Sequence, residues 1–137
     1  MHRGGRRAYR RGMKKVISTP NAPRPLGPYS QGIVANGFLY VAGQVPIDPA
    51  TGTLVEGSIT EQTTRVLDNV TAILEAAGVT RADVVQARVY LRSIADFPEM
   101  NAVYATYFAD EPPARTTIEA GLRAGVNVEI DVVAVAG

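Results

Sequence analysis

The segment from Ser58 to Gly78 constrains the fold of this chain more than any other part of its sequence. Ser58-Ile59-Thr60-Glu61 has the form of a capping box, in which the serine caps a backbone N–H group and the glutamate reaches back. Gly78 supplies a C-terminal stop. Between these signals, apolar residues recur at helical spacing, at Val66, Leu67, Val70, Ile73, Leu74 and Ala77. The segment therefore predicts an amphipathic helix with one apolar face.

Strand patterns surround this helix. Asn36-Gly37 separates two apolar runs, at 31–35 and 38–42, and favours a β-hairpin because both turn positions need a positive φ. A turn is predicted at 48–52, where Asp, Pro and Gly cluster. Four further strands are predicted, at 15–18, 84–92, 115–120 and 127–136. In the second of these, polar residues alternate with an apolar set that is expected to share one face, Val85, Ala87, Val89 and Leu91.

A second helix is predicted between two of these strands. Asp96 has the position of an N-cap, and Pro98 is tolerated in the first turn. Glu111-Pro112 marks the end, because a proline disfavours the helical region for its predecessor. Asn101 lies away from the apolar positions of this helix and is ordinarily a solvated residue. The apolar face consists of Phe97, Met100, Val103, Tyr104, Tyr107 and Phe108.

The order of elements is β-β-β-α-β-α-β-β, which predicts a single α+β domain with both helices on one face of a mixed sheet. In the last strand, Val133 and Val135 share a face with Glu129 and Asp131. The sheet face away from the helices is therefore expected to be partly apolar and partly acidic, a pattern that another subunit often completes. The alternative is a local twist that buries only the end of this strand.

Composition removes several classes of chemistry. The chain of 137 residues has no cysteine, which excludes disulfides, thiolate nucleophiles and cysteine-type zinc sites. The one histidine is His2, so a serine hydrolase triad and nearly every transition-metal site are excluded as well. The sequence also contains no P-loop, dinucleotide-binding fingerprint or EF-hand. No lysine follows Lys15, so the cations of the body are Arg24, Arg65, Arg81, Arg88, Arg92, Arg115 and Arg123.

Charge divides the chain into two parts. Residues 1–15 carry seven basic groups and no acid, whereas residues 16–137 carry seven basic and thirteen acidic groups, a net charge of −6. Residues 1–12 are predicted to be a disordered basic extension: either an arm for nucleic acid or an anionic surface, or a leader before a natural start at Met13. The acidic body argues against nucleic acid as a partner, and no apolar run is long enough to span a membrane.

Arg115 is a candidate ligand-binding residue. It follows the rigid Pro112-Pro113 segment and opens a strand, so its guanidinium group is projected from a fixed edge. The planar fork of arginine matches a carboxylate with two hydrogen bonds, which suits a small acid. The alternative is an ion pair with Asp110, Glu111 or another acid near the strand start.

Glu129 is a candidate general acid or base. It lies in a strand rich in valine and isoleucine, and Asp131 follows on the same face. An acid in such a strand is expected to have a raised pKa or a cationic partner. If it is hydrogen-bonded to a water near Arg115, it serves as general acid or base. The alternative is a structural salt bridge.

Two loop residues are candidates for the wall of a pocket. Gly27-Pro28 fixes a turn that presents Tyr29, whose ring and hydroxyl group either line a pocket or belong to the core. Gly43 follows the hairpin, where a glycine in a strand often marks a close approach of the backbone to another group.

These segments together resemble the RidA/YjgF family of imine/enamine deaminases. The similar stretches are NAPRPLGPYSQG, FLYVAGQVPIDPATG, LDNVTAILEAAG, DFPEMNAVYATYF, PPARTTIEA and VEIDVVAVA, so the resemblance covers residues 13–137. It implies a chorismate-mutase-like fold and a homotrimer with clefts between subunits. It also implies a cytoplasmic hydrolase that converts reactive 2-imino acids, such as 2-iminopropanoate and 2-iminobutanoate, to 2-oxo acids and ammonia without a cofactor or metal. These imines arise from 2-aminoacrylate-type intermediates of PLP enzymes.

The resemblance also assigns site residues. Arg115 is similar to the arginine that binds the substrate carboxylate, and Glu129 to the glutamate that orients or activates water. The substrate-binding positions that match are Tyr29, Gly43, Asn101 and Thr117. Ala42 and Thr117 depart from the common serine and cysteine, which bears on substrate preference. Two other functions stay open: a non-catalytic carboxylate-binding or regulatory trimer, and RNA binding through the basic arm, because some family members are described as ribonucleases or translation inhibitors.

Overall fold

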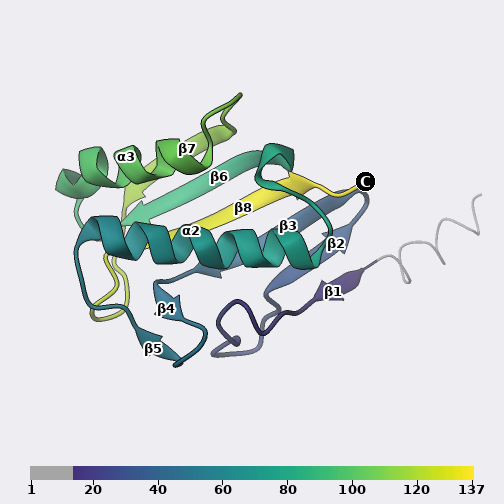
Figure 1. Cartoon of the computed structure of the whole chain (residues 1–137), viewed down its shortest axis with the longest axis horizontal. Coiled ribbons are helices and arrows are strands. Elements are labelled where there is room, and N and C mark those ends of the chain that lie inside the picture. Colours follow the sequence, from purple (N-terminus) through teal and green to yellow (C-terminus); the bar gives the residue numbers. More distant parts are fainter. Residues whose placement is uncertain (1–13) are drawn as a thin grey trace, which may run out of the picture.

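A six-stranded sheet carries both helices on one face, as shown in Figure 1. The computed structural model describes residues 14–137, so the predicted extension at 1–12 lies outside the described residues. The helices are α2 (Ile59–Ala76) and α3 (Phe97–Tyr107). In spatial order the strands are β1 (Lys15–Ile17), β2 (Gly32–Ala35), β3 (Phe38–Gln44), β8 (Val128–Val135), β6 (Val84–Leu91) and β7 (Ala114–Glu119). Among these described strands only β6 and β7 pair in parallel, so the predicted α+β class with a mixed sheet is confirmed.

The predicted hairpin joins β2 and β3. Asn36 and Gly37 have φ values of 53° and 81°, which are the positive angles that a two-residue turn of this kind requires. The predicted turn at 48–52 is also present, and the structure adds a small ribbon around it that the sequence did not predict. Its strands are β4 (Ile47–Asp48) and β5 (Thr53–Leu54).

Helix α2 begins and ends at the predicted signals. The Glu61 amide donates to Ser58 Oγ at 3.1 Å, and the Ser58 amide donates to Glu61 Oε1 at 2.9 Å, which completes the capping box. Gly78, just beyond the helix, has a φ of 79°. The predicted apolar positions between them pack against the sheet, and this packing fixes the helix on one face.

Helix α3 lies where it was predicted, but its start is built differently. Asp96 is the N-cap residue, as predicted, but its side chain makes no capping hydrogen bond, because the chain enters the helix through a 3-10 turn at Ile94–Asp96. Ser93 Oγ accepts from the Ala95 amide in this turn, and Asp96 already has helical backbone angles. The helix ends at Tyr107, before the predicted proline boundary.

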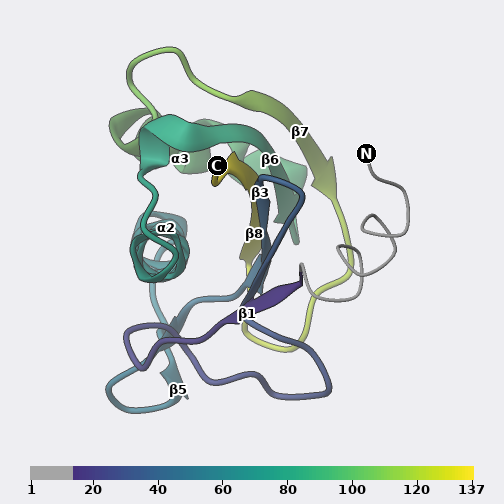
Figure 2. The ribbon, with the colours of Figure 1, turned by 90° about the vertical axis from the view of Figure 1, so that its right-hand side faces the viewer.

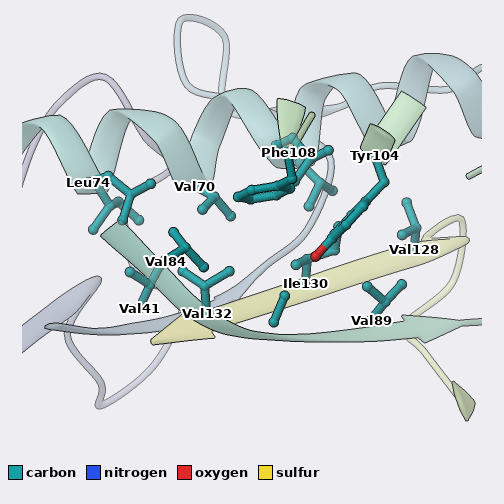
Figure 3. Packing of buried hydrophobic residues seen from close by; sticks show 14 of the residues in the cluster. Val41, Val70, Leu74, Val84, Val89, Tyr104, Phe108, Val128, Ile130 and Val132 are labelled. Atoms are coloured by element: carbon teal, nitrogen blue, oxygen red, sulfur yellow. The ribbon is translucent and has the colours of Figure 1, made fainter. Parts of the chain in front are cut away.

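The core lies between the helices and one face of the sheet. Figure 3 shows Tyr104 and Phe108 reaching from α3 toward Val89, Ile130 and Val132 of the central strands. The predicted alternation in β6 fails at Val85, which is 45% exposed. A register shift between Val84 and Gln86 in the pairing with β8 accounts for this, because the extra residue turns Val85 out of the regular alternation.

The opposite face of the sheet carries no helix, as Figure 2 shows from the side. Its apolar part includes Tyr40 and Val135, which are 48% and 44% exposed. Beside it, Asp131 Oδ1 accepts from Arg88 Nε at 2.8 Å, and Asp131 Oδ2 accepts from the Tyr90 hydroxyl at 2.8 Å. The prediction of a partly apolar and partly acidic face is therefore confirmed. Within residues 14–137, no helix has both the length and the apolar character needed to cross a membrane.

Candidate functional site

Arg115 lies on the helix-covered face of the sheet. It sits in β7 beside Ala87 of β6, whose side chain is fully buried under the helices. Its Nη1 donates to Asn101 Oδ1 at 2.8 Å, so α3 holds the guanidinium group directly. The expectation that Asn101 is solvated was wrong, because β7 brings Arg115 against this side of α3. No ion pair joins Arg115 to an acid among the described residues, so the predicted alternative partners, Asp110 and Glu111, are not used.

Two aromatic rings of α3 complete the surroundings of Arg115. Its guanidinium carbon lies 4.6 Å from the ring centroid of Tyr104 and 5.3 Å from that of Phe97, distances at which a cation is attracted to a ring face. Tyr104 in turn contacts Phe108, with ring centroids 4.8 Å apart. Burial raises the pKa of Tyr104, against the opposing effect of the Arg115 cation. The sequence assigned these aromatic residues to the core, and their contact with Arg115 was missed.

Thr117 shares the Arg115 face of β7, two residues further along the strand. In the register with β6 it lies beside the buried Val89. Its hydroxyl oxygen is buried and has no hydrogen-bond partner within residues 14–137. Arg115, Asn101 and Thr117 therefore form one group, which we call the Arg115 half-site.

Glu129 lies on the open face of the sheet, in β8 beside Tyr90 of β6. Its carboxylate rests directly against Gly43 of β3, where a Cβ atom on the glycine would overlap Oε2. Gly43 falls within a register shift between Val41 and Gln44 in the pairing with β8. The close approach predicted from a glycine in this strand is confirmed, and the approaching group is the candidate acid itself.

The environment of Glu129 raises its pKa. Burial is the larger cause, and the negative charge of Asp131 on the same strand is the second. The ion pair considered for this strand belongs to Asp131, which binds Arg88, and not to Glu129. A half-buried carboxyl group with a raised pKa holds a proton more readily than an exposed one, which suits it to exchanging a proton with water.

A cavity of about 340 Å³ opens beside Glu129. Tyr29 is 50% exposed, and its hydroxyl oxygen accepts from the Leu26 amide at 3.2 Å, so the ring forms part of a wall and not of the core. Arg123 also lines this cavity, and the sequence did not single it out. The lining residues are Leu26, Tyr29, Ala42, Gly43, Val45, Arg123 and Glu129. We call this group the Glu129 half-site.

The two half-sites lie on opposite faces of one sheet. Arg115 is aligned with Ala87 and Glu129 with Tyr90 on the same strand β6, three residues apart, and side chains alternate between faces along a strand. The chain therefore brings Asn101 and Thr117 to Arg115, and Tyr29 and Gly43 to Glu129. It does not bring Arg115 to Glu129. Among residues 14–137 no group of three or more His, Asp or Glu side chains is arranged to hold a metal ion.

Comparison with known proteins places this arrangement in a family. A model of the family described as Endoribonuclease L-PSP matches residues 19–136. A RutC family protein from Pyrococcus horikoshii is 53% identical over 123 residues, which cover 89% of this chain and 98% of that protein. A bovine protein named 2-iminobutanoate/2-iminopropanoate deaminase is 43% identical over 126 residues, which cover 91% of this chain and 92% of that protein.

A solved structure supports the same relationship at the level of the fold. It comes from Yersinia pestis and is described as a protein of the conserved Rid protein family. It is 46% identical, has a TM-score of 0.86, and the match covers 89% of this chain and 98% of that chain. The predicted family resemblance is thus confirmed.

Proposed function

The chain belongs to the Endoribonuclease L-PSP family, the family of the Rid proteins, and on that premise we propose that it hydrolyses reactive 2-imino acids to 2-oxo acids and ammonia. The substrates are small imines such as 2-iminopropanoate and 2-iminobutanoate, which form in the cytoplasm from 2-aminoacrylate-type intermediates. The name of the bovine relative supports this reaction. The observation that carries the proposal is Arg115, which Asn101 and two aromatic rings hold and which forms no ion pair with an acid within residues 14–137.

The complete site forms between two copies of the chain. A small imino acid cannot touch both faces of one sheet, so the Arg115 half-site of one copy meets the Glu129 half-site of a neighbour. The open sheet face supports such an assembly, because it exposes apolar surface near Glu129. This surface includes Val135 of β8, the strand that carries Glu129, and Tyr40 of the neighbouring strand β3. A homotrimer with three equivalent sites satisfies this geometry, since each copy supplies one half of two different sites.

In the substrate complex, Arg115 binds the carboxylate of the imino acid. The guanidinium group keeps its contact with Asn101 through Nη1, and its remaining N–H groups are available to the substrate. The rings of Phe97 and Tyr104 restrict its movement. Fixing the carboxylate fixes the adjacent C=N carbon, which is where water must attack.

Water then adds to the C=N carbon with Glu129 as general base. Glu129 accepts a proton from the water as the C–O bond forms and returns it to the imine nitrogen, which gives a carbinolamine. Glu129 then accepts the hydroxyl proton of this intermediate and passes it to the amino group as the C–N bond breaks, so that ammonia leaves and the C=O bond of the 2-oxo acid forms. The raised pKa of Glu129 suits a group that first accepts and then returns a proton. Tyr29 closes the wall of the cavity beside it.

Such a site needs only a few functional groups. Imines hydrolyse spontaneously in water, so the protein has to lower the barrier by a modest amount, chiefly by positioning the carboxylate and the water. The body of the chain has neither cysteine nor lysine, and its one candidate acid and one candidate carboxylate binder are sufficient for this mechanism.

Mixing two variants tests both the reaction and the split site. Arg115→Ala removes the carboxylate binder, and Glu129→Gln removes the base, so each variant alone is expected to lose acceleration of imine hydrolysis. When the two chains are unfolded together and refolded as mixed oligomers, about one quarter of the sites receive an intact half from each chain. The measurement is the release of 2-oxo acid from an imine generated in situ.

The outcomes separate the alternatives. Recovery of activity to about one quarter of the wild-type rate supports a deaminase site shared between copies. If the wild-type chain is active but the mixture of the two variants stays inactive, the site is not shared between copies. Binding of a 2-oxo acid by the wild-type chain without any imine turnover contradicts the deaminase and favours a non-catalytic carboxylate-binding protein.

A further inference from the structure

Arg123 is a cation in the Glu129 half-site that the proposed reaction does not use. The other residues that line the cavity are apolar or small, apart from Tyr29 and Glu129. Within the described part of the chain, the guanidinium group of Arg123 has no hydrogen-bond or ion-pair partner. It is therefore an arginine beside a cavity with its binding groups free.

The backbone that carries Arg123 is held by a second arginine. Arg92 Nη2 donates to the carbonyl oxygen of Leu122 at 2.8 Å and also to that of Arg123. Arg92 Nε donates to the carbonyl oxygen of Val126 at 3.0 Å. One guanidinium group thus ties three carbonyl groups of the loop between β7 and β8, which we call the Arg123 loop and which spans residues 122–127.

A buried glutamine fixes the end of the same loop. Gln62 of α2 is 1% exposed, and its Nε2 donates to the Gly125 carbonyl oxygen at 2.8 Å. Its Oε1 accepts from the Asn127 amide at 2.8 Å. Val126 between them is fully buried. The loop is anchored from both sides, so the Arg123 side chain extends from a fixed backbone and not from a mobile loop.

We propose that Arg123 is a specificity-determining residue that binds a second carboxylate, so that the site accepts 2-imino dicarboxylic acids. This inference rests on the proposed function, in which Arg115 of a neighbouring copy binds the first carboxylate. The planar fork of an arginine pairs with a carboxylate through two hydrogen bonds, and a free guanidinium group at a cavity wall is placed for that contact. The reaction itself is unchanged: water adds, ammonia leaves and the second carboxylate is retained.

Charge at the cavity supports this assignment. Glu129 and the nearby Asp131 are both acidic, and Asp131 is neutralised by Arg88. Without Arg123, a second carboxylate on the substrate would be repelled by Glu129. The positive charge of Arg123 at the same cavity offsets that repulsion. A monocarboxylic imine makes no use of Arg123, so discrimination between the two substrate classes depends on this one side chain.

The test compares two imines of equal carbon number. Amino acid oxidases generate 2-iminoglutarate from glutamate and 2-iminopentanoate from norvaline, and kcat/KM is measured for each from the loss of imine. In Arg123→Gln, the ratio of kcat/KM for the dicarboxylic over the monocarboxylic imine is expected to fall about tenfold, as for the loss of a charge-assisted hydrogen bond. Arg123→Lys keeps the charge without the fork and should give an intermediate ratio.

Arg81→Gln is the matched control, because Arg81 is also exposed but lines a different cavity near the ends of α2 and α3. It should leave the ratio at its wild-type value. A wild-type chain that accelerates 2-iminopentanoate but not 2-iminoglutarate overturns the role of Arg123 and leaves the proposed function intact. An unchanged ratio in Arg123→Gln also overturns it. A wild-type chain that accelerates neither of these imines but does accelerate 2-iminobutanoate also overturns the role of Arg123, and one that accelerates none of the three contradicts the proposed function itself.

Discussion

The two half-sites of this protein are built to different degrees within one chain. The Arg115 half-site is nearly complete: one hydrogen bond to Asn101 and two aromatic rings hold the guanidinium group against α3. The Glu129 half-site is open, and its carboxylate is placed mainly by the space that Gly43 leaves for it. The group proposed to bind the substrate carboxylate is therefore organised in advance, whereas the group proposed to act as the base lies on a sheet face that no helix covers.

This difference follows from the two faces of the sheet. On the helix-covered face, α3 lies over the sheet and supplies both polar and aromatic partners. The Arg115 guanidinium group is therefore partly shielded from water and contacted by these side chains within a single chain. On the open face no helix lies over Glu129, and strand and loop residues line its cavity. The ionic contact on this face, between Arg88 and Asp131, does not include Glu129. A second copy of the chain would supply to Glu129 what α3 supplies to Arg115.

Replacing Arg115 tests the Arg115 half-site and should produce the largest fall in kcat/KM. Arg115→Ala is expected to lower kcat/KM for 2-iminobutanoate about 100-fold or more, because two charge-assisted hydrogen bonds to the carboxylate are lost. Arg115→Lys retains the charge but not the fork, and should recover only part of that loss. Circular dichroism controls for folding. Wild-type kcat/KM in a folded Arg115→Ala protein would contradict the assignment.

Replacing Gly43 tests the open half-site by filling its space. In Gly43→Ala the new methyl group would displace the Glu129 carboxylate, so kcat/KM is expected to fall about tenfold while the thermal unfolding temperature changes little. Gly121→Ala is the control, because a Cβ atom there meets nothing within 4 Å. Equal activity in the two variants would show that the position of Glu129 against Gly43 is unimportant for the reaction.

Replacing Asn101 tests how much its hydrogen bond to Arg115, which positions the guanidinium group before substrate binds, contributes to substrate binding. Asn101→Ala removes one hydrogen bond but leaves both rings in place, so KM is expected to rise about fivefold with little change in kcat. Asn101→Asp keeps an oxygen acceptor but places a carboxylate against Arg115, so it should raise KM more than Asn101→Ala does. A large fall in kcat with unchanged KM would mean that Asn101 acts on the reacting atoms and not through Arg115.

The sequence predicted those elements whose signals are local. The turn at Asn36-Gly37 and the capping box at Ser58 each contain their own hydrogen-bonding requirements within a few residues, and the structure confirms both. Val85 was assigned to the wrong environment because its orientation depends on a register shift against β8, which is distant in the sequence. The 3-10 entry to α3 was missed because Asp96 satisfies the same sequence pattern with or without a capping contact.

The candidate site shows the same limit more strongly. The types of Arg115 and Glu129 marked them as chemically useful, but nothing local indicates that they face opposite sides of the sheet. That fact depends on the registers of β7 and β8 against β6. Asn101 of α3 was expected in solvent because its partner, Arg115, belongs to a strand that only the fold brings beside the helix. Arg123 was only one of seven body arginines until the fold placed it at a cavity.

The smallest expected effect concerns the pH dependence of the open half-site. Burial and the charge of Asp131 raise the pKa of Glu129, and a general base works only when it is ionised. The rate should therefore fall as the pH decreases through this raised pKa. In Asp131→Asn one cause of the raised pKa is removed, so the acid limb of the kcat/KM profile should move to lower pH, although burial still holds the pKa of Glu129 above its ordinary value.

Two controls distinguish this effect from a general loss of structure. Glu129→Gln cannot titrate at this position, so its residual activity should lack the acid limb altogether. The thermal unfolding temperature gives an independent check of sign: a carboxyl group whose folded pKa is raised lowers stability as the pH rises through that pKa. Glu129→Gln should therefore unfold at a slightly higher temperature than wild type at neutral pH and at the same temperature in acid. An acid limb that stays in place in Asp131→Asn, or that persists in Glu129→Gln, would assign the titration to another group and remove Glu129 from the role of base.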